Sequence, residues 1–299
     1  MMFDNRSEDV KRGLELVSRL GEVMPGEAEE EVRVIYEDIR ARLRVPFVNF
    51  IFRVLANYPE YLEFAWARIS PYLLMEPFER LADDLRARAL PEPISERSEV
   101  NWETLGDLDR IRTFTDTIHY VLPKLLLVAS ALDEGLGGKS GVPAEVGRDQ
   151  VELGAAESTG LVQMVSREDA DIRLQALLNE IKERHGHPDV ASYYRGLANW
   201  PEFLGAVWGE LDPMLDSGPV GERKLDLLRH AAGVAGLMPL PDLDGVAGLG
   251  LGDDDIQTLR AVLAVFRFRI IPDTFVEVAL IKAFIDGPDA ALKSRFSFV

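Results

Sequence analysis

Charged residues interrupt the most apolar part of the chain, near its C-terminus. Within residues 261–285, five charges stand among aliphatic and aromatic side chains: Arg267, Arg269, Asp273, Glu277 and Lys282. Such charges on a helix either line a cleft that binds a polar ligand or pair with one another. The four-residue steps from Arg269 to Asp273 and on to Glu277 are partly consistent with ion pairing along one helical face. The sequence therefore leaves a polar cleft and an internal ion-pair ladder as alternatives.

Other patterns that could carry chemistry are incomplete. His185 and His187 could bind a metal from a turn, but no third ligand follows at a useful spacing, so we expect an exposed pair and no metal. The run from Asp133 to Ser140 imitates a phosphate-binding loop, yet it has Asp133 where that loop requires glycine. The chain contains no cysteine, which excludes thiol nucleophiles, disulfides and sulfur-ligated metals. We expect no cofactor.

The charge of the chain limits its partners. Lys and Arg total 33 against 51 Asp and Glu, which gives a formal net charge of −18. Nucleic acids bind clustered basic residues, and an acidic excess repels their backbone, so we expect no nucleic-acid partner. The N-terminus lacks the apolar core of a signal peptide, and no apolar stretch approaches the ~20 residues of a membrane helix. These features predict a cytoplasmic protein without a membrane partner.

Helices are predicted to position the polar residues. Apolar side chains recur at helical spacing through nearly the whole chain, for example at Val32, Ile35, Tyr36, Ile39 and Leu43, which form one face of an amphipathic helix. No strand-like alternation of comparable length is present. The sequence predicts an all-α fold, and its 47% of hydrophobic residues is enough to fill a core.

An internal repeat organises the predicted helices. A shift of 142 residues aligns residues 36–73 with residues 178–215, and 14 of the 38 positions are identical, where unrelated segments would share about two or three. The matches include Trp66 with Trp208, for which we expect a core position. We interpret this similarity as a duplication that produced two homologous helical repeats.

The repeat defines the expected domain organisation. We expect an N-terminal extension at 1–26, a first helical repeat at 27–132, a glycine-rich linker at 133–164 and a second helical repeat at 165–299. The repeats are expected to pack as a pseudo-dimer about an approximate two-fold axis, with a cleft between them for a small-molecule ligand. The sequence leaves open whether the whole chain also forms a homodimer.

Several segments of the chain resemble the group I 2-haloacid dehalogenases, a family that acts on both D- and L-2-haloacids. The order and spacing of the segments make the resemblance specific. The matching segments are YEDIR at 36–40, LRVPF at 43–47, RVL at 53–55, AW at 65–66, PK at 123–124, ALDE at 131–134, AS at 191–192, LANWP at 197–201, DG at 286–287 and AALKS at 290–294.

The resemblance implies an enzyme with its active site between the repeats. In the family, an Asp activates a water molecule that attacks C2 of a 2-haloalkanoate and displaces halide with inversion, without a covalent intermediate. Counting back from Pro201 places Tyr193 at the position of that Asp, and Leu122 takes the place of an Asn that holds the water. Tyrosine is a poor general base at neutral pH because its ordinary pKa is about 10. These two departures predict loss or change of the family reaction.

The resemblance also implies which residues form the pocket. Phe47 and Phe50 match aromatic wall residues, and Ser192 matches the serine beside the base. Ser192 and Tyr193 would hydrogen-bond the substrate or water. Asp189 lies four residues before Tyr193, one helical turn away, and is the candidate substitute base.

Three functions remain as alternatives. The first is hydrolysis of a small 2-haloalkanoate, in which Arg267 and Arg269 would supply the positive charge that a carboxylate needs in an acidic protein. The second is a family member that binds a small organic acid or an apolar ligand in the inter-repeat cleft without catalysis. The third is a helical scaffold without a ligand, which predicts solid packing between residues 47–50 and 189–193.

Overall fold

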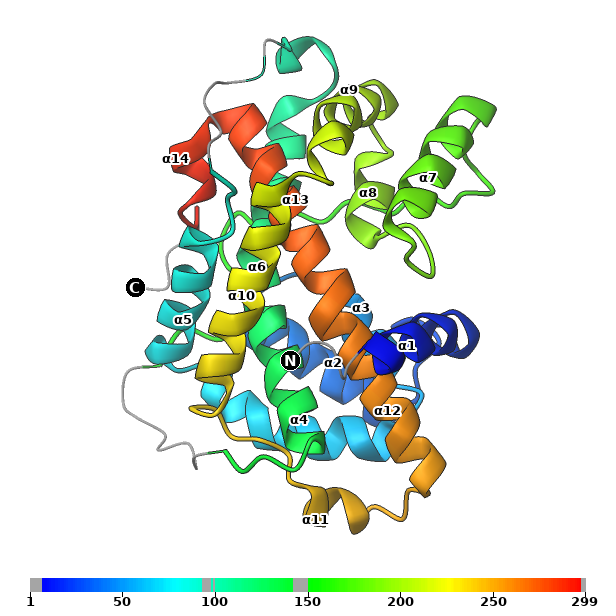
Figure 1. Cartoon of the computed structure of the whole chain (residues 1–299), viewed down its shortest axis with the longest axis vertical. Helices are drawn as coiled ribbons and strands as arrows, with labels where there is room; N and C mark the ends of the chain where they lie inside the picture. Colours follow the sequence, from blue (N-terminus) through cyan, green and yellow to red (C-terminus); the bar gives the residue numbers. More distant parts are fainter. Residues whose placement is uncertain (1–6, 93–97, 99, 142–149, 297–299) are drawn as a thin grey trace.

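Helices dominate the computed structural model, which describes residues 7–92, 98, 100–141 and 150–296. No strand occurs in these ranges apart from a single isolated bridge between Met75 and Gln150. The predicted all-α fold is confirmed for this part of the chain. The helices, labelled as in Figure 1, are α1 (Ser7–Leu20), α2 (Glu30–Leu43), α3 (Phe50–Leu55), α4 (Pro59–Leu73), α5 (Glu76–Ala87), α6 (Leu108–Leu136), α7 (Ile172–His185), α8 (Ser192–Leu197), α9 (Pro201–Leu211), α10 (Gly218–Ala235), α11 (Leu243–Ala247), α12 (Asp253–Val265), α13 (Ile271–Asp286) and α14 (Pro288–Ala291).

Short helical turns of other kinds complete the chain path. Two of them are 3₁₀ turns, at Trp102–Thr104 and Asp212–Met214, and a π-helical turn at Phe266–Ile270 joins α12 to α13. Pro272, the second residue of α13, lies two positions after that turn. Proline has no backbone N–H, and its ring clashes with the carbonyl four residues earlier, so it disfavours a regular α-helix there. Single π turns inside helices are frequent at functional sites.

Side-chain caps define where the principal helices begin. The Asp107 carboxylate accepts a hydrogen bond from the backbone N–H of Arg110 at the start of α6, and Asp171 accepts one from Leu174 at the start of α7. These bonds satisfy backbone donors that have no partner inside the helix. The α7 helix ends at Gly186, whose φ of 61° is the left-handed conformation that glycine adopts at low cost. The bounds of both helices thus have local causes in the sequence.

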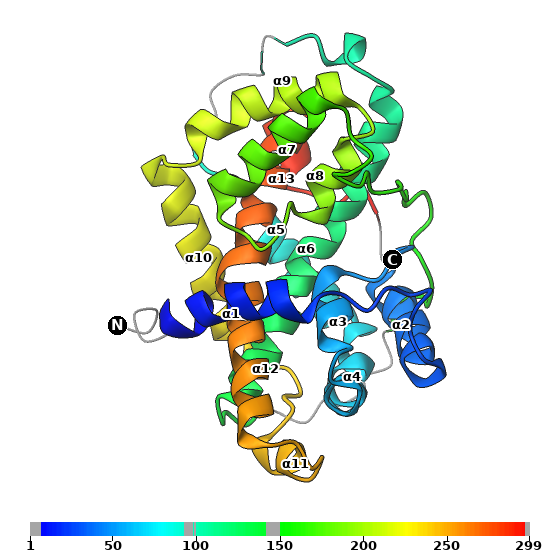
Figure 2. The same ribbon diagram turned by 90° about the vertical axis from the view of Figure 1, so that its right-hand side faces the viewer.

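Two long helical segments cross the molecule in opposite directions and pack on each other. Figures 1 and 2 show α6 running down the molecule and the chain returning upward through α12 and α13. The α2–α4 group lies around the lower half of this pair, and the α7–α9 group lies around the upper half. Each long segment begins beside the helices of the other half: Trp102, just before α6, packs on Phe203 of α9 with ring centroids 5.4 Å apart. The two halves are therefore interlocked.

The first helix packs across α12 at a close crossing. A Cβ atom added to Gly13 would lie 2.1 Å from the carbonyl oxygen of Ala261, so only glycine permits this approach. The helix was expected within an N-terminal extension, and it covers one face of the second long segment.

Helix boundaries recur at the spacing at which the sequence repeats. The first residues of α2, α3, α4 and α5 precede those of α7, α8, α9 and α10 by 142 positions in each case. Equivalent hydrogen bonds recur as well. The Trp66 indole N–H donates to Asp38 at 2.7 Å, and that of Trp208 donates to Glu180 at 2.8 Å.

The glycine-rich stretch between the halves is partly helical and partly bound to the first half. Helix α6 continues to Leu136, so the expected linker begins inside it. Residues 142–149 lie outside the described residues. Beyond them, the backbone N–H groups of Val151 and Gly154 donate to the carbonyls of Leu74 and Ala41. In the described parts of the chain, no helix is both long enough and apolar enough to cross a membrane.

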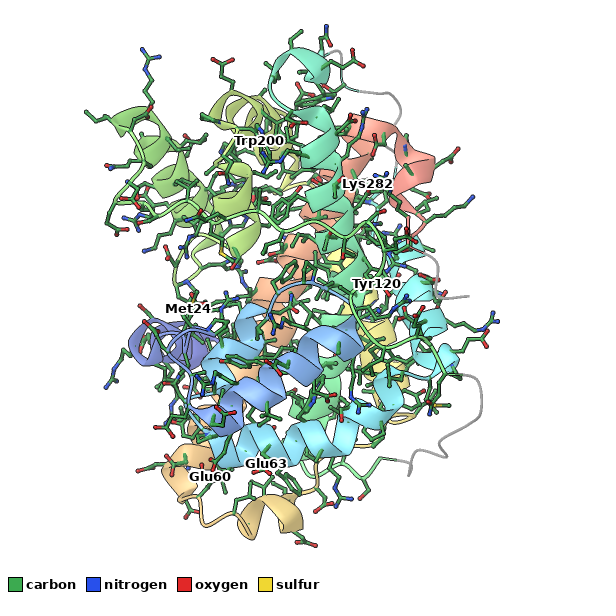
Figure 3. The ribbon with its side chains drawn as sticks, turned by 180° about the vertical axis from the view of Figure 1, so that it is seen from behind. Met24, Glu60, Glu63, Tyr120, Trp200 and Lys282 are labelled. Atoms are coloured by element: carbon green, nitrogen blue, oxygen red, sulfur yellow. The ribbon has the colours of Figure 1, made fainter. Side chains whose placement is uncertain are left out.

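Buried ion pairs connect α6 to its neighbours. Lys124, fully buried, lies 2.5 Å from Glu79 of α5 and 3.9 Å above the Tyr120 ring. Lys282 of α13 pairs with Asp116 of α6; Figure 3 labels Lys282 and Tyr120 among the packed side chains. Because an unpaired buried charge is costly, these pairs fix how the central helices meet. Of the two alternatives that the sequence left open for the charges on residues 261–285, Lys282 follows the second, because it is held in an ion pair.

Candidate functional site

A pocket lies at the junction of the two halves of the molecule. Its cavity volume is about 100 Å³, enough for a molecule of a few non-hydrogen atoms. It separates residues 47–50 from residues 189–193, so the solid packing required of a ligand-free scaffold is not found there. Five segments line it: residues 47–53, residues 114–125 of α6, residues 161–164, residues 187–193 and residues 266–274.

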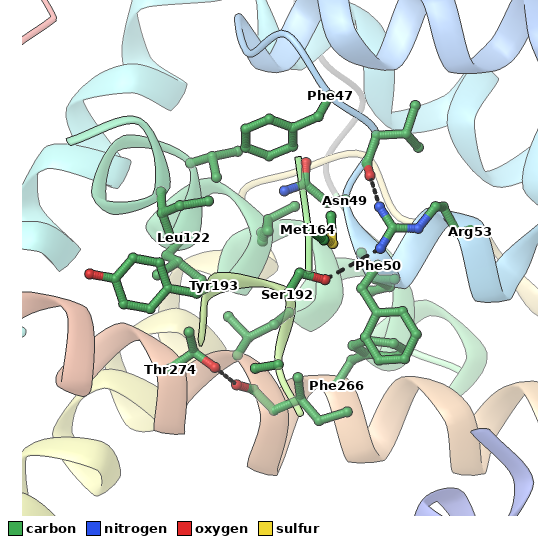
Figure 4. A pocket seen from close by; sticks show the side chains of 18 of the residues that line it. Phe47, Asn49, Phe50, Arg53, Leu122, Met164, Ser192, Tyr193, Phe266 and Thr274 are labelled. Atoms are coloured by element: carbon green, nitrogen blue, oxygen red, sulfur yellow. Dashed lines mark hydrogen bonds between the residues drawn. The ribbon is translucent and has the colours of Figure 1, made fainter. Parts of the chain in front are cut away.

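Aliphatic side chains and several aromatic rings form the pocket wall. Phe50 of α3 meets Phe266 of the π turn edge to face, with ring centroids 5.1 Å apart. Phe114 of α6 stacks on Tyr193 of α8 at 5.6 Å, and Phe47 completes the wall. Figure 4 shows Phe50 and Phe266 together on one side of the pocket. The walls therefore favour an apolar substituent.

Polar groups reach the pocket from both halves. The Asn49 side chain is buried, and its Oδ1 atom has no hydrogen-bond partner among the described residues. Arg53 is 4% exposed, pairs with Glu22 at 2.6 Å and donates to Ser192 Oγ at 3.4 Å (Figure 4). Because arginine only donates, the Ser192 hydroxyl proton is free to point elsewhere. This part of the pocket thus presents a guanidinium whose charge is balanced by Glu22 and one hydroxyl donor.

The two residues that the resemblance places at catalytic positions, Tyr193 and Leu122, do not offer a base in this structure. The Tyr193 hydroxyl lies 3.0 Å from Thr115 Oγ1, and Figure 4 shows it directed away from Ser192. Burial raises the pKa of Tyr193 well above its ordinary value, so the phenolate is not available at neutral pH. Leu122 is a buried aliphatic residue of the pocket wall. The pocket thus has no base at these positions.

Asp189 lines the pocket but also faces solvent and two arginines. Its side chain is 51% exposed and lies 3.7 Å from Arg167 and 4.0 Å from Arg195. Its Oδ1 atom accepts a hydrogen bond from the Val190 backbone N–H at 2.8 Å. The carboxylate expected from the sequence as a substitute base is therefore at the pocket, with part of its capacity to accept hydrogen bonds in use.

Arg267 and Arg269, expected to bind a carboxylate, do not line the pocket. The buried Arg267 guanidinium pairs with Asp133 at 2.7 Å and with Glu134 at 2.6 Å on α6. Arg269 is 45% exposed, pairs with Asp273 at 3.5 Å and donates to the His185 carbonyl. The π turn separates neighbouring side chains, so that Phe266 enters the pocket while Arg267 points to α6. The positive charge at the pocket belongs to Arg53 instead.

The two histidines expected to be exposed are buried. His185 and His187 each expose 6% of their surface, and their rings stack with centroids 5.0 Å apart. His185 donates from Nδ1 to the Ile181 carbonyl and from Nε2 to Glu277 at 2.9 Å. Burial opposes its charged form, but Glu277 outweighs burial and raises the pKa of His185. The two histidines can be buried because Asp273 and Glu277, 86 and 92 positions further along the chain, pair with them. The sequence around the histidines does not indicate these distant partners.

His187 lines the pocket and pairs with Asp273 of α13. Its Nε2 atom lies 3.1 Å from Asp273 Oδ2. The sequence alone does not predict a role in the pocket for His187, Asn49 or Arg53. Only Arg53 carried a signal, because it is one of the positions shared by the two repeats.

These features define an all-helical protein with an apolar, partly aromatic pocket between two halves. The sequence profile of the family described as halocarboxylic acid dehydrogenase DehI matches residues 46–194. A 2-haloacid dehalogenase described as configuration-inverting, from Alcaligenes xylosoxydans xylosoxydans, is 32% identical over 286 residues, which cover 89% of this chain and 94% of that protein. The chain belongs to this family of 2-haloacid dehalogenases.

Further relatives and solved structures agree with this assignment. An (R)-2-haloacid dehalogenase from Pseudomonas putida is 27% identical over 263 residues, covering 81% of this chain and 85% of the relative. The structure of a D-2-haloacid dehalogenase in complex with L-LA superimposes with a TM-score of 0.78 at 24% identity, covering 89% of this chain and 96% of that one. A mutant of a D-2-haloacid dehalogenase in complex with D-2-CPA gives a TM-score of 0.75. These structures establish that the fold is shared.

Proposed function

We propose that this protein hydrolyses small 2-haloalkanoates by direct attack of water at C2, with inversion of configuration. The observation that carries the proposal is the pocket itself: apolar, partly aromatic walls for the halogen and alkyl group, with Arg53, Ser192 and Asn49 among the polar groups on its surface. Its relatives are named as 2-haloacid dehalogenases. A substrate with an apolar halogen beside a carboxylate matches both kinds of surface.

In this proposal the polar residues and some of the apolar residues that line the pocket have separate physical roles. The substrate carboxylate lies toward Arg53 and the Ser192 hydroxyl, where it gains a charge-assisted hydrogen bond. Phe47, Phe50 and Leu122 pack against the carbon–halogen end. The amide of Asn49 is available to hold the attacking water, which the family's Asn holds from the position of Leu122. Attack from the face opposite the halogen inverts C2.

The range of enantiomers is part of the proposal. The resemblance to the group I enzymes implies that both D- and L-substrates react. Halide release from D- and L-2-chloropropionate, followed by chiral analysis of the hydroxy acid, tests this directly. The expected result is release from both, with inverted products.

A second function is favoured by one observation, the absence of a base at the family's positions. If Tyr193 and Leu122 abolish the chemistry, the pocket still binds a small organic acid or an apolar ligand without turnover. Calorimetric titration with 2-chloropropionate and with its hydroxy-acid product separates the two. Binding without halide release supports the binding function, and halide release supports the enzyme.

The two halves are further proposed to have arisen by duplication and to pack as a pseudo-dimer, with the expected extension, repeats and linker as its parts. Support comes from helix bounds that recur at 142 residues and from equivalent indole hydrogen bonds. The backbone N–H groups of Val23 and Val165, also 142 residues apart, each donate to the carbonyl of an equivalent arginine at 3.0 Å. Self-superposition of an experimental structure tests this proposal.

A further inference from the structure

We propose that His187, oriented by Asp273, is the general base that activates the attacking water in this protein. The inference rests on the proposed hydrolytic function and assigns its missing base. A general base must reach the pocket, must have a lone pair directed at water and must be held in one orientation. His187 lines the pocket, and its Nε2 atom contacts the carboxylate of Asp273.

The contact with Asp273 determines which ring nitrogen carries the proton. The Asp273 carboxylate can only accept, so the Nε2–H group of His187 donates to Asp273 Oδ2 across 3.1 Å. In the neutral ring this leaves the lone pair on Nδ1. Among the described residues, Nδ1 has no hydrogen-bond partner. It is therefore the atom that can accept a proton from water.

Asp273 is suited to hold the imidazole and to stabilise it once it is protonated. Burial opposes its charge, but its hydrogen bond to His187 and the nearby cations Lys224, at 2.9 Å, and Arg269, at 3.5 Å, lower its pKa to about 2. The carboxylate is therefore ionised at every pH at which the protein would work. An ionised carboxylate behind an imidazole fixes its tautomer and stabilises the imidazolium.

The other candidates at the pocket are less suitable. The Tyr193 hydroxyl is turned toward Thr115 and its pKa is raised by burial. Asp189 is half exposed and faces two arginines, and one of its oxygens already accepts a backbone N–H. Solvent and cations compete with the substrate water for that carboxylate, whereas the His187 ring is 6% exposed.

The proposed step balances without a cofactor. Water gives a proton to His187 Nδ1 while its oxygen forms a bond to C2 of the haloacid. The carbon–halogen bond breaks, and the halide leaves with the bonding electron pair. The imidazolium then releases its proton to solvent, which regenerates the base. The products are the 2-hydroxy acid, halide and one proton.

The pH dependence of this step is set in charged surroundings. His185, stacked on His187, is bound to Glu277, which also accepts from the Tyr194 hydroxyl at 2.6 Å. Charged and titratable groups surround the pair of His187 and Asp273 from every element packed against it. They are Lys182, Glu183 and His185 on α7, Arg167 and Asp189 in loops, Tyr193 and Tyr194 on α8, Lys224 on α10, Arg269 on the π turn, and Glu277 on α13.

The test measures halide release by His187→Gln, Asp273→Asn and Asp189→Asn. We expect His187→Gln to lower kcat by about 100-fold or more, which is the usual contribution of a general base, while KM changes little. Asp273→Asn is expected to lower kcat and to shift the acid limb of the pH profile to lower pH, which a merely structural role would not do. Asp189→Asn is expected to lower kcat far less than His187→Gln does. His230→Gln serves as the matched control, because His230 pairs with Asp84 away from the pocket.

The pH profile of the unaltered protein gives an independent measurement if the His187 variant does not fold. A histidine base predicts that kcat/KM falls at a higher pH on acidification than it would with a carboxylate base, because histidines as a class bind their proton at higher pH than carboxylates. A fall only in the pH range typical of a carboxylate, loss of turnover only in Asp189→Asn, or full turnover in folded His187→Gln would overturn the assignment. Absence of halide release from the unaltered protein would instead refute the proposed function, and the assignment with it.

Discussion

Ser192 illustrates how one contact determines what a pocket residue can offer. Arg53, from the first half of the chain, donates to the Ser192 oxygen from the second half. The serine proton is then free for a ligand, and the arginine charge lies within the same pocket wall. Neither property is visible in the two residues taken separately.

At this site we expect Ser192→Ala to weaken substrate binding more than it slows chemistry. Removal of one hydrogen bond to a charged group costs about 1.5–3 kcal/mol, which corresponds to a rise in KM of roughly 10- to 100-fold. Steady-state kinetics with 2-chloropropionate measures both parameters. An equal loss in kcat would contradict a role in ground-state binding, and Ser130→Ala, a buried serine of α6 outside the pocket, is the control.

Asp273 is expected to make the stability of the protein depend on pH. Its pKa is lowered from 3.8 to about 2, so the folded state holds the ionised form more tightly than the unfolded state. The resulting stabilisation is present above about pH 4 and is lost as the pH falls toward 2. The shift corresponds to about 2 kcal/mol.

Urea unfolding at pH 7 and at pH 2.5 measures this effect. The difference in unfolding free energy between the unaltered protein and Asp273→Asn is expected to shrink by about 2 kcal/mol at the lower pH. Asp109→Asn, at a carboxylate that is 97% exposed, provides the comparison. A difference that stays constant with pH would show that Asp273 contributes only packing.

Among the elements, the crossing of α1 over α12 depends on a single glycine. Gly13 has the Ala261 carbonyl where its Cβ would lie, so a methyl group must push the helices apart. In contrast, Gly209 of α9 has open space around it. The same substitution at the two sites therefore separates helix packing from helix propensity.

We expect Gly13→Ala to destabilise the protein by about 1–3 kcal/mol, as overpacking does. Gly209→Ala is expected to stabilise it by about 0.5–1 kcal/mol, because alanine loses less backbone freedom in a helix. Thermal unfolding followed by circular dichroism gives both values. Equal effects at the two glycines would contradict the close α1–α12 crossing.

At the scale of the whole molecule, the net charge of −18 opposes the binding of a carboxylate. Because the acidic residues outnumber the basic ones over the whole chain, an anionic substrate approaches against a negative potential. Salt screens this long-range repulsion more than it screens a buried contact. We therefore expect the affinity for 2-chloropropionate to rise with ionic strength.

Titration at ~20 and ~200 mM ionic strength measures this effect, with sodium sulfate as the salt because chloride is a product of the reaction. The neutral analogue 2-chloropropionamide is the control, and its affinity is expected not to change. A fall in the affinity for the acid would show that attraction by Arg53 outweighs the overall charge.

The helical part of the fold could be predicted because its causes are local. Apolar periodicity, aspartates that cap helices and prolines in the first turn act within a few residues, and α2, α4, α7 and α9 begin and end accordingly. The family resemblance likewise located Phe47, Phe50, Leu122, Asp189, Ser192 and Tyr193, which all line one pocket. The sequence did not place the charges on the apolar segment 261–285.

Only the tertiary structure decided how those charges are used, because their partners are distant in the sequence. Arg267 pairs with Asp133, and His187 with Asp273, across 134 and 86 residues. The π turn before Pro272 determines which side chains face the pocket. No local sequence pattern predicts that turn. The sequence by itself determined the class of fold and the kind of pocket. A charge that is buried in the protein needs a partner of opposite charge. The long-range pairs that result determined which polar groups remain available for chemistry.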